Sequence, residues 1–598
     1  MITKPTYVAD FETITRDGVE QVWLYDICNL KNLDHNIGSN IEDFIKFIDN
    51  LEYASRVYFH NLKFDGSFLI DYFLKNGYEL SRSDNRRIKK NTFTLLVTEF
   101  GQFFKITYKN RYGKQIELID SLKVLQLSVD KLAKDFKLPI LKGSIDYNKK
   151  RDEDYIPSEV EIEYVKNDTE IVARCLQIFI EQGHDKLTLS SCAFTEYKHI
   201  IGRNKYSNWF GDWERKCDLT LDTEIREAYR GGFCQPNVNF INKTIKSPVW
   251  YNDVNSLYPF VMSTYDLPYG KPIEFEGKYE TDTEYPYYVQ KIKVNMCVRE
   301  KGIPCILNKS KGVDCNYIVD TQENTSCGSL IELTLTNFDM ELMFKNYEIF
   351  DIKYNGGYKF RVRNDMFTGY INKFYEMKEK ATIESNGALR CIAKLFLNSL
   401  YGKFGQNPIR RRKLPYIDLE NKVKFYKTEK TISKKFNYLP VAVFITALAR
   451  YKVINDIMKI GIENWVYTDT DSILSLTPFP SEMVDNKKLG KYKVEQIFKK
   501  CRILGPKTYY GVNTRNEITA KACGCNKKAL ENFPIGKFNF GETVKNGRTT
   551  LKTVAGGKKI DFADFTFRDK TKYYKIFKEN NVTYCLITKG KYKKLCKH

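Results

Sequence analysis

Acidic residues stand at the ends of apolar stretches at three widely separated places in this chain, which limits the folds that suit it. Asp10 and Glu12 follow TYVA, Asp253 ends VWYND, and Asp469 and Asp471 lie in WVYTDTDSILSL. Side chains two residues apart share one face of a strand, so both pairs place like charges side by side. Such closeness is unfavourable unless a cation lies nearby. The pattern predicts strands that carry carboxylates to divalent metal ions, with a solvated turn as the alternative for residues 469–471.

The length and charge of the chain indicate a multidomain protein with a polyanionic partner. At 598 residues it is too long for one core, and roughly three to five domains are expected. The net charge of +22 favours nucleic acid as the partner, and the aromatic content of 14% adds stacking surface for bases. The N-terminus lacks the apolar region of a signal peptide, and no apolar run is long enough for a membrane helix. We therefore expect a protein of the cytoplasm that does not bind membranes.

Positive charge is concentrated in two segments. Residues 405–437 carry ten Lys and Arg against three Asp and Glu, and residues 571–598 carry eight Lys against one Glu. A solvated face is the ordinary explanation for such a run. Because the two segments flank the acidic pair at 469–471, contact with a phosphate backbone is the better interpretation.

Hydrophobic periodicity gives a coarse secondary structure. It predicts helices over 159–183, 386–405 and 438–461, and a hairpin over 464–476. Residues 184–228 are mixed and are expected to connect domains. Residues 265–365 are expected to hold short strands and turns.

The first 170 residues contain a set of groups suited to phosphodiester hydrolysis. Asp65 follows FHNLKF, and Tyr164 and Asp168 are four residues apart, so they share one face of a helix. Together with Asp10 and Glu12, these carboxylates suit two Mg²⁺ ions and a metal-activated water, which Tyr164 would orient.

A second set lies downstream. Asp253 and Asp471 suit two metal ions around a triphosphate, one activating a 3′-hydroxyl and one holding the leaving phosphates. Between them, Lys394, Asn398 and Tyr401 fall on one helix stripe, which Arg390 extends by a turn. A cation, an amide and an aromatic ring suit a triphosphate, a sugar and a base. The alternative is an ordinary surface stripe on a core helix.

These motifs resemble those of a known enzyme family. The acids of the first set resemble the three motifs of the DEDD-type proofreading exonucleases that carry a Tyr. The stretches DVNSLYP, KLFLNSLYG and YTDTDS resemble motifs A, B and C of family B DNA polymerases, and GPKTYYG resembles their Lys-x-Tyr motif. The early position of Asp10, with YRGG and LKGSIDY, is similar to the protein-primed branch of that family. The resemblance covers roughly residues 7–568.

The resemblance implies a multidomain α/β and α+β fold, with an RNase-H-like 3′–5′ exonuclease domain before a right-hand polymerase domain. The implied divisions are exonuclease 1–185, connector and first part of the palm 186–264, first insertion 265–365, fingers 366–404, second insertion 405–437, palm 438–528, thumb 529–570 and a basic tail 571–598. The first insertion would contact the priming terminal protein, and the second would close over DNA. The tail would be an additional DNA-binding arm or a disordered end.

The resemblance also implies roles for individual residues. In the exonuclease, the implied metal ligands are Asp10, Glu12, Asp65 and Asp168, the implied assisting groups are Tyr164 and Lys142, and the implied contacts with the 3′ end are Thr13, Asn61, Phe64, Ser121 and Leu122. In the polymerase, the implied metal site is Asp253, Val254 and Asp471 with Asp469 beside it, the nucleotide pocket is Ser256, Leu257, Tyr258, Arg390, Lys394, Asn398 and Tyr401, and the DNA contacts are Tyr229, Gly231, Gly232, Lys507 and Tyr509. Lys378 or Lys380 would assist Lys394; the sequence leaves that choice open.

The expected protein is a monomeric DNA polymerase with proofreading that uses a protein primer, is processive and displaces a strand. Its partners would be template and primer DNA, deoxynucleoside triphosphates and a terminal protein, with two Mg²⁺ ions, or Mn²⁺, in each site. It would act in the cytoplasm of the cell that hosts a phage or linear plasmid. Three alternatives stay open: a stand-alone exonuclease with a DNA-binding half, a single-strand binding protein, and an RNA polymerase or reverse transcriptase. The bulk of Tyr258 argues against ribonucleotide use.

Overall fold

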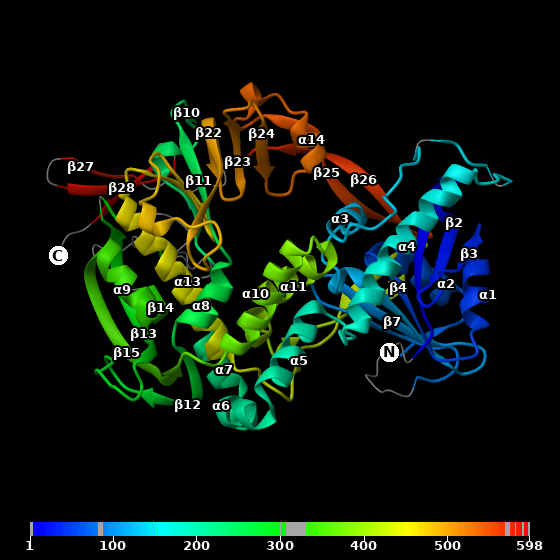
Figure 1. The fold of residues 1–598 in the computed structure, drawn as a ribbon, viewed down its shortest axis with the longest axis horizontal. Coiled ribbons are helices and arrows are strands. Elements are labelled where there is room, and N and C mark those ends of the chain that lie inside the picture. Colours follow the sequence, from blue (N-terminus) through cyan, green and yellow to red (C-terminus); the bar gives the residue numbers. More distant parts are fainter. Residues whose placement is uncertain are drawn as a thin grey trace.

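The computed structural model describes residues 4–81, 88–147, 149–152, 154–299, 301–306 and 331–568, and the backbone of three strands between residues 575 and 595. An N-terminal α/β part lies beside a larger part built around a second sheet (Figure 1). Of the helices in the described residues, none has the length and apolarity needed to cross a membrane.

The N-terminal part is an eight-stranded sheet in the order β3-β2-β1-β4-β8-β7-β6-β5. Its elements are β1 (Thr6–Arg16), β2 (Val19–Asn29), β3 (His35–Gly38), α1 (Ile41–Asp49), β4 (Ser55–Phe59), α2 (Leu62–Lys75), β5 (Glu79–Leu80), β6 (Thr92–Val97), β7 (Phe103–Lys109), β8 (Gln115–Asp120), α3 (Val129–Asp135) and α4 (Glu159–Glu181). The central strands β1, β4 and β8 are parallel, whereas β2 and β7 run antiparallel to their neighbours. Helices packed on a partly parallel sheet are the α/β fold expected here.

Three helices follow, where the sequence predicted mixed structure. They are α5 (Leu189–Ile201), α6 (Arg203–Lys216) and α7 (Leu219–Arg226). The segment is helical because its large side chains at Tyr197, Trp213 and Ile225 are buried in the main core. Burial of one face against a core is what stabilises such helices in water.

The second sheet has the strand order β24-β23-β22-β11-β21-β20-β9, with β10 paired to β22. Its strands are β9 (Cys234–Pro236), β10 (Thr244–Ile245), β11 (Val249–Val254), β20 (Trp465–Asp469), β21 (Ser472–Ser475), β22 (Tyr492–Gly505), β23 (Thr508–Asn513) and β24 (Ile518–Ala522). Its pairings are antiparallel, and the hairpin predicted over 464–476 is confirmed as β20 and β21. The helices α8 (Leu257–Thr264) and α13 (Leu439–Ile460) accompany it. The helix predicted over 438–461 is confirmed as α13, and most of its side chains are buried.

Residues 265–365 form a longer and more regular unit than the short strands and turns that we expected. The unit contains a four-stranded sheet in the order β12-β15-β13-β14, with one helix between β14 and β15 in the chain. The elements are β12 (Leu267–Phe275), β13 (Tyr287–Val298), β14 (Ile331–Thr336), α9 (Asn337–Asn346) and β15 (Tyr347–Arg363). That expectation was wrong because β15 is 17 residues long and bridges β12 and β13, a pairing between distant segments that no local pattern encodes.

The predicted helix over 386–405 is divided in two. The helical hairpin α10 (Thr368–Ile383) and α11 (Gly387–Ser399) is followed by the short α12 (Tyr401–Phe404). Residues 405–437 then form two small ribbons, β16 (Ile409–Arg410) with β19 (Thr431–Ile432), and β17 (Lys413–Ile417) with β18 (Val423–Lys427). This segment rests on the N-terminal part, where the Phe425 and Phe103 ring centroids are 5.8 Å apart.

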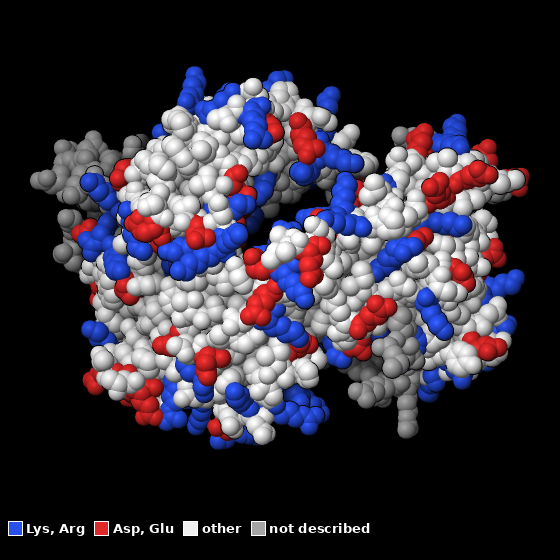
Figure 2. All heavy atoms as spheres, viewed as in Figure 1, with Lys and Arg blue, Asp and Glu red and all other residues white. Residues whose placement is uncertain are grey.

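A long hairpin reaches from the second sheet to the first. After α14 (Lys527–Glu531) come β25 (Thr543–Val554) and β26 (Gly557–Thr566), whose tip lies against the N-terminal sheet. The Glu20 N–H donates to the Ala555 carbonyl at 2.9 Å, and Ala555 forms β-bridges with Val19 and Lys422. The hairpin, the N-terminal sheet and segment 405–437 therefore meet, and Figure 2 shows an opening through the molecule with Lys and Arg side chains along its rim.

The C-terminal segment forms a small antiparallel sheet of β27 (Lys575–Glu579), β28 (Val582–Thr588) and β29 (Lys591–Leu595). This backbone differs from the disordered end that was one of our two expectations. The side chains of these strands lie outside the described residues, so the expected role as a DNA-binding arm stays a prediction.

Candidate active sites

Two acidic motifs meet in the second sheet. Asp253 lies opposite Ser472 in the antiparallel pair of β11 and β21, so Asp471 comes directly before its partner. The Val254 N–H donates to the Asp471 carbonyl at 2.8 Å, and the Asp471 N–H donates to the Asp469 carbonyl at 2.8 Å. Thr470 adopts the left-handed backbone (φ 66°) that this tight turn requires. The fold thus brings together Asp253 and Asp471, which are 218 positions apart in the chain.

The electrostatics of these carboxylates favour the binding of a cation. Burial, then the neighbouring Asp471, raises the pKa of Asp253 to about 7. Burial and the charge of Asp469 raise the pKa of Asp471. Like charges held together in a partly buried site disfavour ionisation of both groups, and a bound cation removes that penalty. The side chain of Val254 is a buried hydrocarbon without donor atoms, so Val254 could serve as a ligand only through its main-chain carbonyl.

The Lys-x-Tyr segment lies next to the second acidic motif. The Lys507 ammonium donates to Asp469 Oδ1 at 2.7 Å, and the Lys507 N–H donates to the Tyr467 hydroxyl at 2.8 Å. Tyr509 is buried below, with its ring centroid 5.5 Å from that of Tyr467. Lys507 is therefore the solvent-accessible group of this pair.

A tyrosine pair forms the floor beside the acids. Tyr258 on α8 stacks on Tyr401 with ring centroids 4.3 Å apart. Ser256, which precedes α8, has a left-handed backbone (φ 52°), and Leu257 is buried. Gly232 is fitted against this floor, since a Cβ there would lie 2.7 Å from Thr470 Cγ2 and 3.2 Å from the Tyr258 hydroxyl.

The cationic stripe on α11 is confirmed for its first three members. Arg390, Lys394 and Asn398 are exposed at four-residue intervals. Tyr401 instead begins α12, because α11 ends at Ser399, so the stripe is not carried by one continuous helix. The charge of Lys394 lowers the pKa of Asp253, so Lys394 lies within electrostatic range of the polymerase acids.

The structure separates the two candidate lysines on α10. Burial, together with the charges of Arg390 and Lys394, lowers the pKa of Lys378. Lys380 is largely exposed and pairs with Glu384 at 3.8 Å. Lys378 is therefore the one that lies with the α11 stripe.

The four acids of the N-terminal part also lie together. Asp10 and Glu12 are on β1, Asp65 is in the first turn of α2, and Asp168 is on α4. Burial, then the charge of Asp168, raises the pKa of Asp10 to about 7. Burial and the charge of Asp10 likewise raise the pKa values of Glu12 and Asp65.

Two buried carboxylate oxygens of this cluster are suited to a cation. Oδ1 of Asp65 and Oδ1 of Asp168 are buried and have no hydrogen-bond partner. Buried carboxylate oxygens without partners are unfavourable unless an ion satisfies them. Within the described residues, however, no three His, Cys, Asp or Glu side chains lie close enough to hold an ion. The two-ion arrangement expected at each acid cluster therefore stays a prediction.

Lys142 and Tyr164 border the acid cluster. The Lys142 ammonium pairs with Asp168 and lies 4.9 Å from the Tyr164 ring centroid. The sequence analysis missed Tyr147 as a site residue, although it stands within the quoted LKGSIDY. Its hydroxyl lies 2.8 Å from that of Tyr164.

The residues expected to contact a 3′ end differ in accessibility. Asn61, with a left-handed backbone (φ 90°), and Phe64 lie at the start of α2, and Thr13 donates to Glu20 Oε1 at 3.0 Å. Leu122 is partly exposed and its N–H donates to Asp120 Oδ1 at 3.0 Å. Ser121 is fully buried, and its hydroxyl donates to the Phe59 carbonyl at 3.0 Å. Ser121 thus supports the loop and does not present its side chain to solvent.

A buried ion-pair network that no sequence pattern indicated joins the YRGG segment to the unit 265–365. Asp339 on α9 is fully buried and pairs with Arg450 at 2.9 Å and Arg230 at 2.7 Å. Arg450 also donates to the carbonyls of Arg230 and Gly231 at 2.7 and 2.8 Å. Tyr229, next in the segment, lies against Gly405. The two glycines expected to guide DNA are therefore held by residues far apart in sequence.

The comparisons with known proteins agree with these two sites. A family model described as DNA polymerase type B, organellar and viral, matches residues 50–161 and 147–477. The DNA polymerase of Bacillus phage M2 is 36% identical over 568 residues, covering 93% of this chain and 96% of the relative. The structure of phi29 DNA polymerase with primer-template DNA matches with a TM-score of 0.86 and 34% identity, covering 94% of this chain and all of that one. Its complex with primer-template DNA and incoming nucleotides gives 0.85 and 33%, with the same coverage.

The fold and its paired acid sites are those of a nucleotidyltransferase with a second, hydrolytic centre, and the chain belongs to the type B DNA polymerases of organelles and viruses. Within that family it is similar to the polymerases of the phi29 group of phages, for which protein-primed replication and exonuclease activity are characteristic. Polymerases of this family use divalent metal ions, generally Mg²⁺. Because the match runs through both halves of the chain, the alternative of a stand-alone nuclease is not favoured.

Proposed function

We propose that this polymerase extends a 3′-hydroxyl with deoxynucleotides in the second sheet and trims 3′ ends in the first. The observation that carries the proposal is the adjacency of Asp253 and Asp471 across β11 and β21. DNA and nucleotides are the partners, since the phi29 structures that match over nearly the whole chain hold primer-template DNA and incoming nucleotides.

In the polymerase site, Asp253 and Asp471 would hold two divalent ions with the main chain of Val254, and Asp469 would hold Lys507 in position. The ions would supply charge neutralisation for the triphosphate and acidify the attacking hydroxyl. Lys394 and Lys378 bring ammonium groups to the phosphates, and Arg390 extends this cationic face. Tyr258 stacked on Tyr401 gives a rigid wall under the sugar, with Ser256, Leu257 and Asn398 around the nucleotide.

In the exonuclease site, Asp10, Glu12, Asp65 and Asp168 would hold the ions, because two of these acids have buried oxygens without partners. Tyr164 would orient a water, and its contact with the Tyr147 hydroxyl supports this role. Lys142 balances the charge of Asp168. Thr13, Asn61, Phe64 and Leu122 border the site and would receive the frayed 3′ end, with Ser121 supporting them from within.

The hairpin β25–β26, the N-terminal sheet and segment 405–437 would enclose DNA and keep the enzyme on its template. Contact of the hairpin tip with Val19 and Lys422 closes this path, and the ten Lys and Arg of segment 405–437 suit sequence-independent phosphate contacts. In this proposal the exonuclease is 1–185, and the connector with the first part of the palm is 186–264. The fingers are 366–404, the rest of the palm is 438–528 and the thumb is 529–570.

Initiation would use a protein primer. The phage relatives favour this, and the unit 265–365 is the proposed surface for the terminal protein because Asp339 ties it to the YRGG segment. Replication in the cytoplasm of a host cell follows from the same phage relatives and is part of the proposal.

The test is extension of a primed single-stranded circle with Mg²⁺ and four deoxynucleotides, with no accessory protein. Products longer than the circle would support polymerisation, processivity and strand displacement together. Failure to incorporate any nucleotide would contradict the proposal, whereas stopping after one turn would remove only strand displacement.

A further inference from the structure

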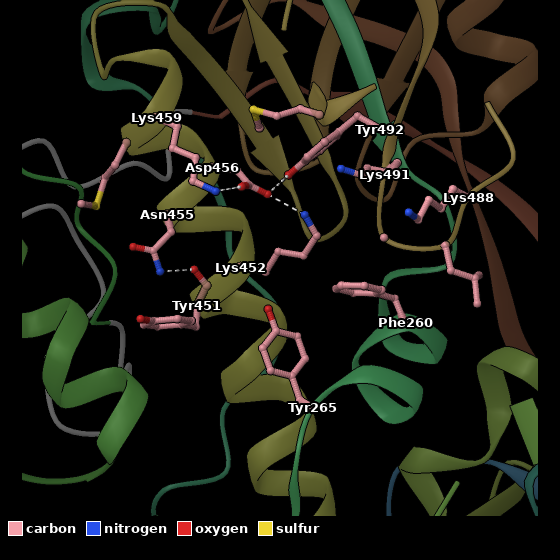
Figure 3. A pocket seen from close by; sticks show the side chains of 14 residues that line it. Phe260, Tyr265, Tyr451, Lys452, Asn455, Asp456, Lys459, Lys488, Lys491 and Tyr492 are labelled. Atoms are coloured by element: carbon pink, nitrogen blue, oxygen red, sulfur yellow. Dashed lines mark hydrogen bonds and ion pairs between the residues drawn. The ribbon is translucent and has the colours of Figure 1, made fainter. Parts of the chain in front are cut away.

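A pocket of about 750 Å³ lies behind the strand that carries Asp253. Its walls are α13, the end of α8 and the loop 483–492 (Figure 3). Tyr492 in its wall pairs with Val254 in the register of β11 and β22, so the pocket is one strand away from the polymerase acids. Nothing in the two active sites uses it.

Its lining carries an excess of positive charge. Four lysines, Lys452, Lys459, Lys488 and Lys491, line the pocket against a single acid, Asp456. Asp456 is buried and already accepts from Lys452 at 2.6 Å, from Lys459 at 3.4 Å and from the Tyr492 hydroxyl at 3.0 Å.

The lysine ammonium groups on the loop side of the pocket have few hydrogen-bond partners. Lys491 donates to the Glu482 carbonyl, and within the described residues the Lys488 ammonium donates no hydrogen bond. Asp485, near the start of the loop, uses Oδ1 to accept the N–H groups of Lys487 and Lys488, both at 2.8 Å. In the described part of the chain Lys488 is thus the lysine whose ammonium has no hydrogen-bond partner, and Lys459 and Lys491 each make one contact, so an ammonium with three N–H donors still has donors for an anion there.

Aromatic rings form the remaining wall. Phe260 and Tyr265 lie below the lysines in Figure 3, whereas Tyr451 lies on the other side of α13 from Phe260, with its hydroxyl donating to Glu341 at 2.7 Å. The Lys452 ammonium is 5.7 Å from the Phe260 ring centroid and 4.8 Å from that of Tyr492. Rings beside ammonium groups suit a ligand with a flat aromatic part and a phosphate. The volume is within the usual range for small-molecule sites, about 300–1,000 Å³.

We propose that this pocket binds a nucleotide unit, with its base on the rings of Phe260 and Tyr265 and its phosphates between Lys459, Lys488 and Lys491. The unit comes from a free nucleoside triphosphate or from a single strand leaving the enzyme. It is a site separate from polymerisation, since its lining has one acid, already engaged, and needs no metal ion to hold phosphate. The inference goes beyond the proposed function and does not depend on it.

The first experiment uses the full chain in EDTA, where nucleotide binding that requires divalent ions is abolished. Fluorescent mant-dATP is titrated by anisotropy, and photolysis with 8-azido-dATP is followed by mass spectrometry of adducts on Phe260 or Tyr265. A second arm uses an oligothymidylate that carries 5-iododeoxyuridine. We expect adducts in EDTA with at least one of the two reagents.

The decisive variant is Lys459→Glu/Lys488→Glu, and its matched control is Lys31→Glu/Lys46→Glu, two exposed lysines of the N-terminal part with the same change in net charge. The pocket variant should weaken binding in the responding arm about tenfold, which is 1.4 kcal/mol. The control should bind like the parent. Adducts with 8-azido-dATP identify a free nucleoside triphosphate as the ligand. Adducts from the oligonucleotide alone identify a single strand as the ligand. Absence of metal-free binding in both arms, or equal binding by the two variants, would overturn the proposal.

Discussion

The backbone N–H of Val254 donates a 2.8 Å hydrogen bond to the carbonyl of Asp471. This bond fixes motif A of the polymerase site, which carries Asp253, against motif C, which carries Asp471. The register of β11 and β21 then decides which side chains share a face, because a shift of one residue would turn Asp253 away from Asp471. The chemistry of the site is thus set by strand pairing more than by the acids themselves.

Asp253→Asn should abolish polymerisation and spare trimming. The amide cannot supply the negative charge that a divalent ion requires, so we expect incorporation to fall by about 10³-fold or more. Primer extension and degradation of a labelled 3′ end are measured on the same preparation. Asp65→Asn is the mirrored control, which should lose degradation and keep extension. Parallel loss of both activities in either variant would contradict two independent sites.

The stability of the metal-free protein should fall as pH rises from about 4 to about 7. The pKa of Asp253 is raised to about 7 in the folded state, whereas an unfolded Asp titrates near 3.9, so between these values the folded state retains a proton that the unfolded chain releases. The contribution is complete below pH 4 and lost above pH 7.

Asp253→Asn removes the part of that dependence that comes from Asp253, whereas Asp10, whose pKa is also raised to about 7, keeps its own part. In EDTA at pH 8 the variant should melt at a higher temperature than the parent, with the difference shrinking towards pH 4. Mg²⁺ at pH 8 should raise the melting temperature of the parent more than that of the variant. Equal pH profiles of thermal unfolding for the two proteins would show that Asp253 is not the titrating group.

Tyr258→Val should increase ribonucleotide insertion. The ring of Tyr258 is held against Tyr401 at 4.3 Å, so in the proposed pocket it would resist displacement by a 2′-hydroxyl. We expect the preference for deoxynucleotides to decrease by about 10- to 100-fold. Single-nucleotide insertion with matched ribo- and deoxynucleotides gives the ratio. Tyr258→Phe keeps the ring and should keep the selectivity, and sugar selection unchanged by Val would exclude this role.

Gly556→Ala should reduce processivity. At the hairpin tip (φ 85°) an added Cβ would lie 2.2 Å from the Glu20 carbonyl oxygen, so the hairpin cannot stay closed on the N-terminal sheet. Overpacking of this kind costs about 1–3 kcal/mol, which lowers the closed population about tenfold. Product length is measured at one enzyme per many templates, over increasing salt.

Gly541→Ala is the matched control for that experiment. Gly541 also has a left-handed backbone (φ 89°), but a Cβ there would meet nothing within 4 Å. Any loss common to both variants comes from backbone strain, and only the excess in Gly556→Ala reports hairpin closure. Equal product lengths in the two variants would rule out the clamp role of the hairpin.

The amino-acid sequence by itself determined the functional acids and several of the elements that carry them. The alternation in WVYTDTDSILSL predicted the hairpin β20–β21, and the spacing of Arg390, Lys394 and Asn398 predicted the exposed stripe of α11. These features are local: side-chain periods of 2 and 3.6 residues and turn preferences are written in neighbouring residues. For that reason they can be recognised without any knowledge of the fold.

Only the tertiary structure decided which distant groups meet. Packing between segments that are far apart in the chain brings Asp339 to Arg230 and Arg450, Tyr147 to Tyr164 and Ala555 to Val19. The same packing puts Lys378, and not Lys380, beside the α11 stripe. The long β15 and the break at Leu400 arise in the same way. Non-local pairing depends on how whole elements bury their apolar faces together, and no window of sequence contains that information.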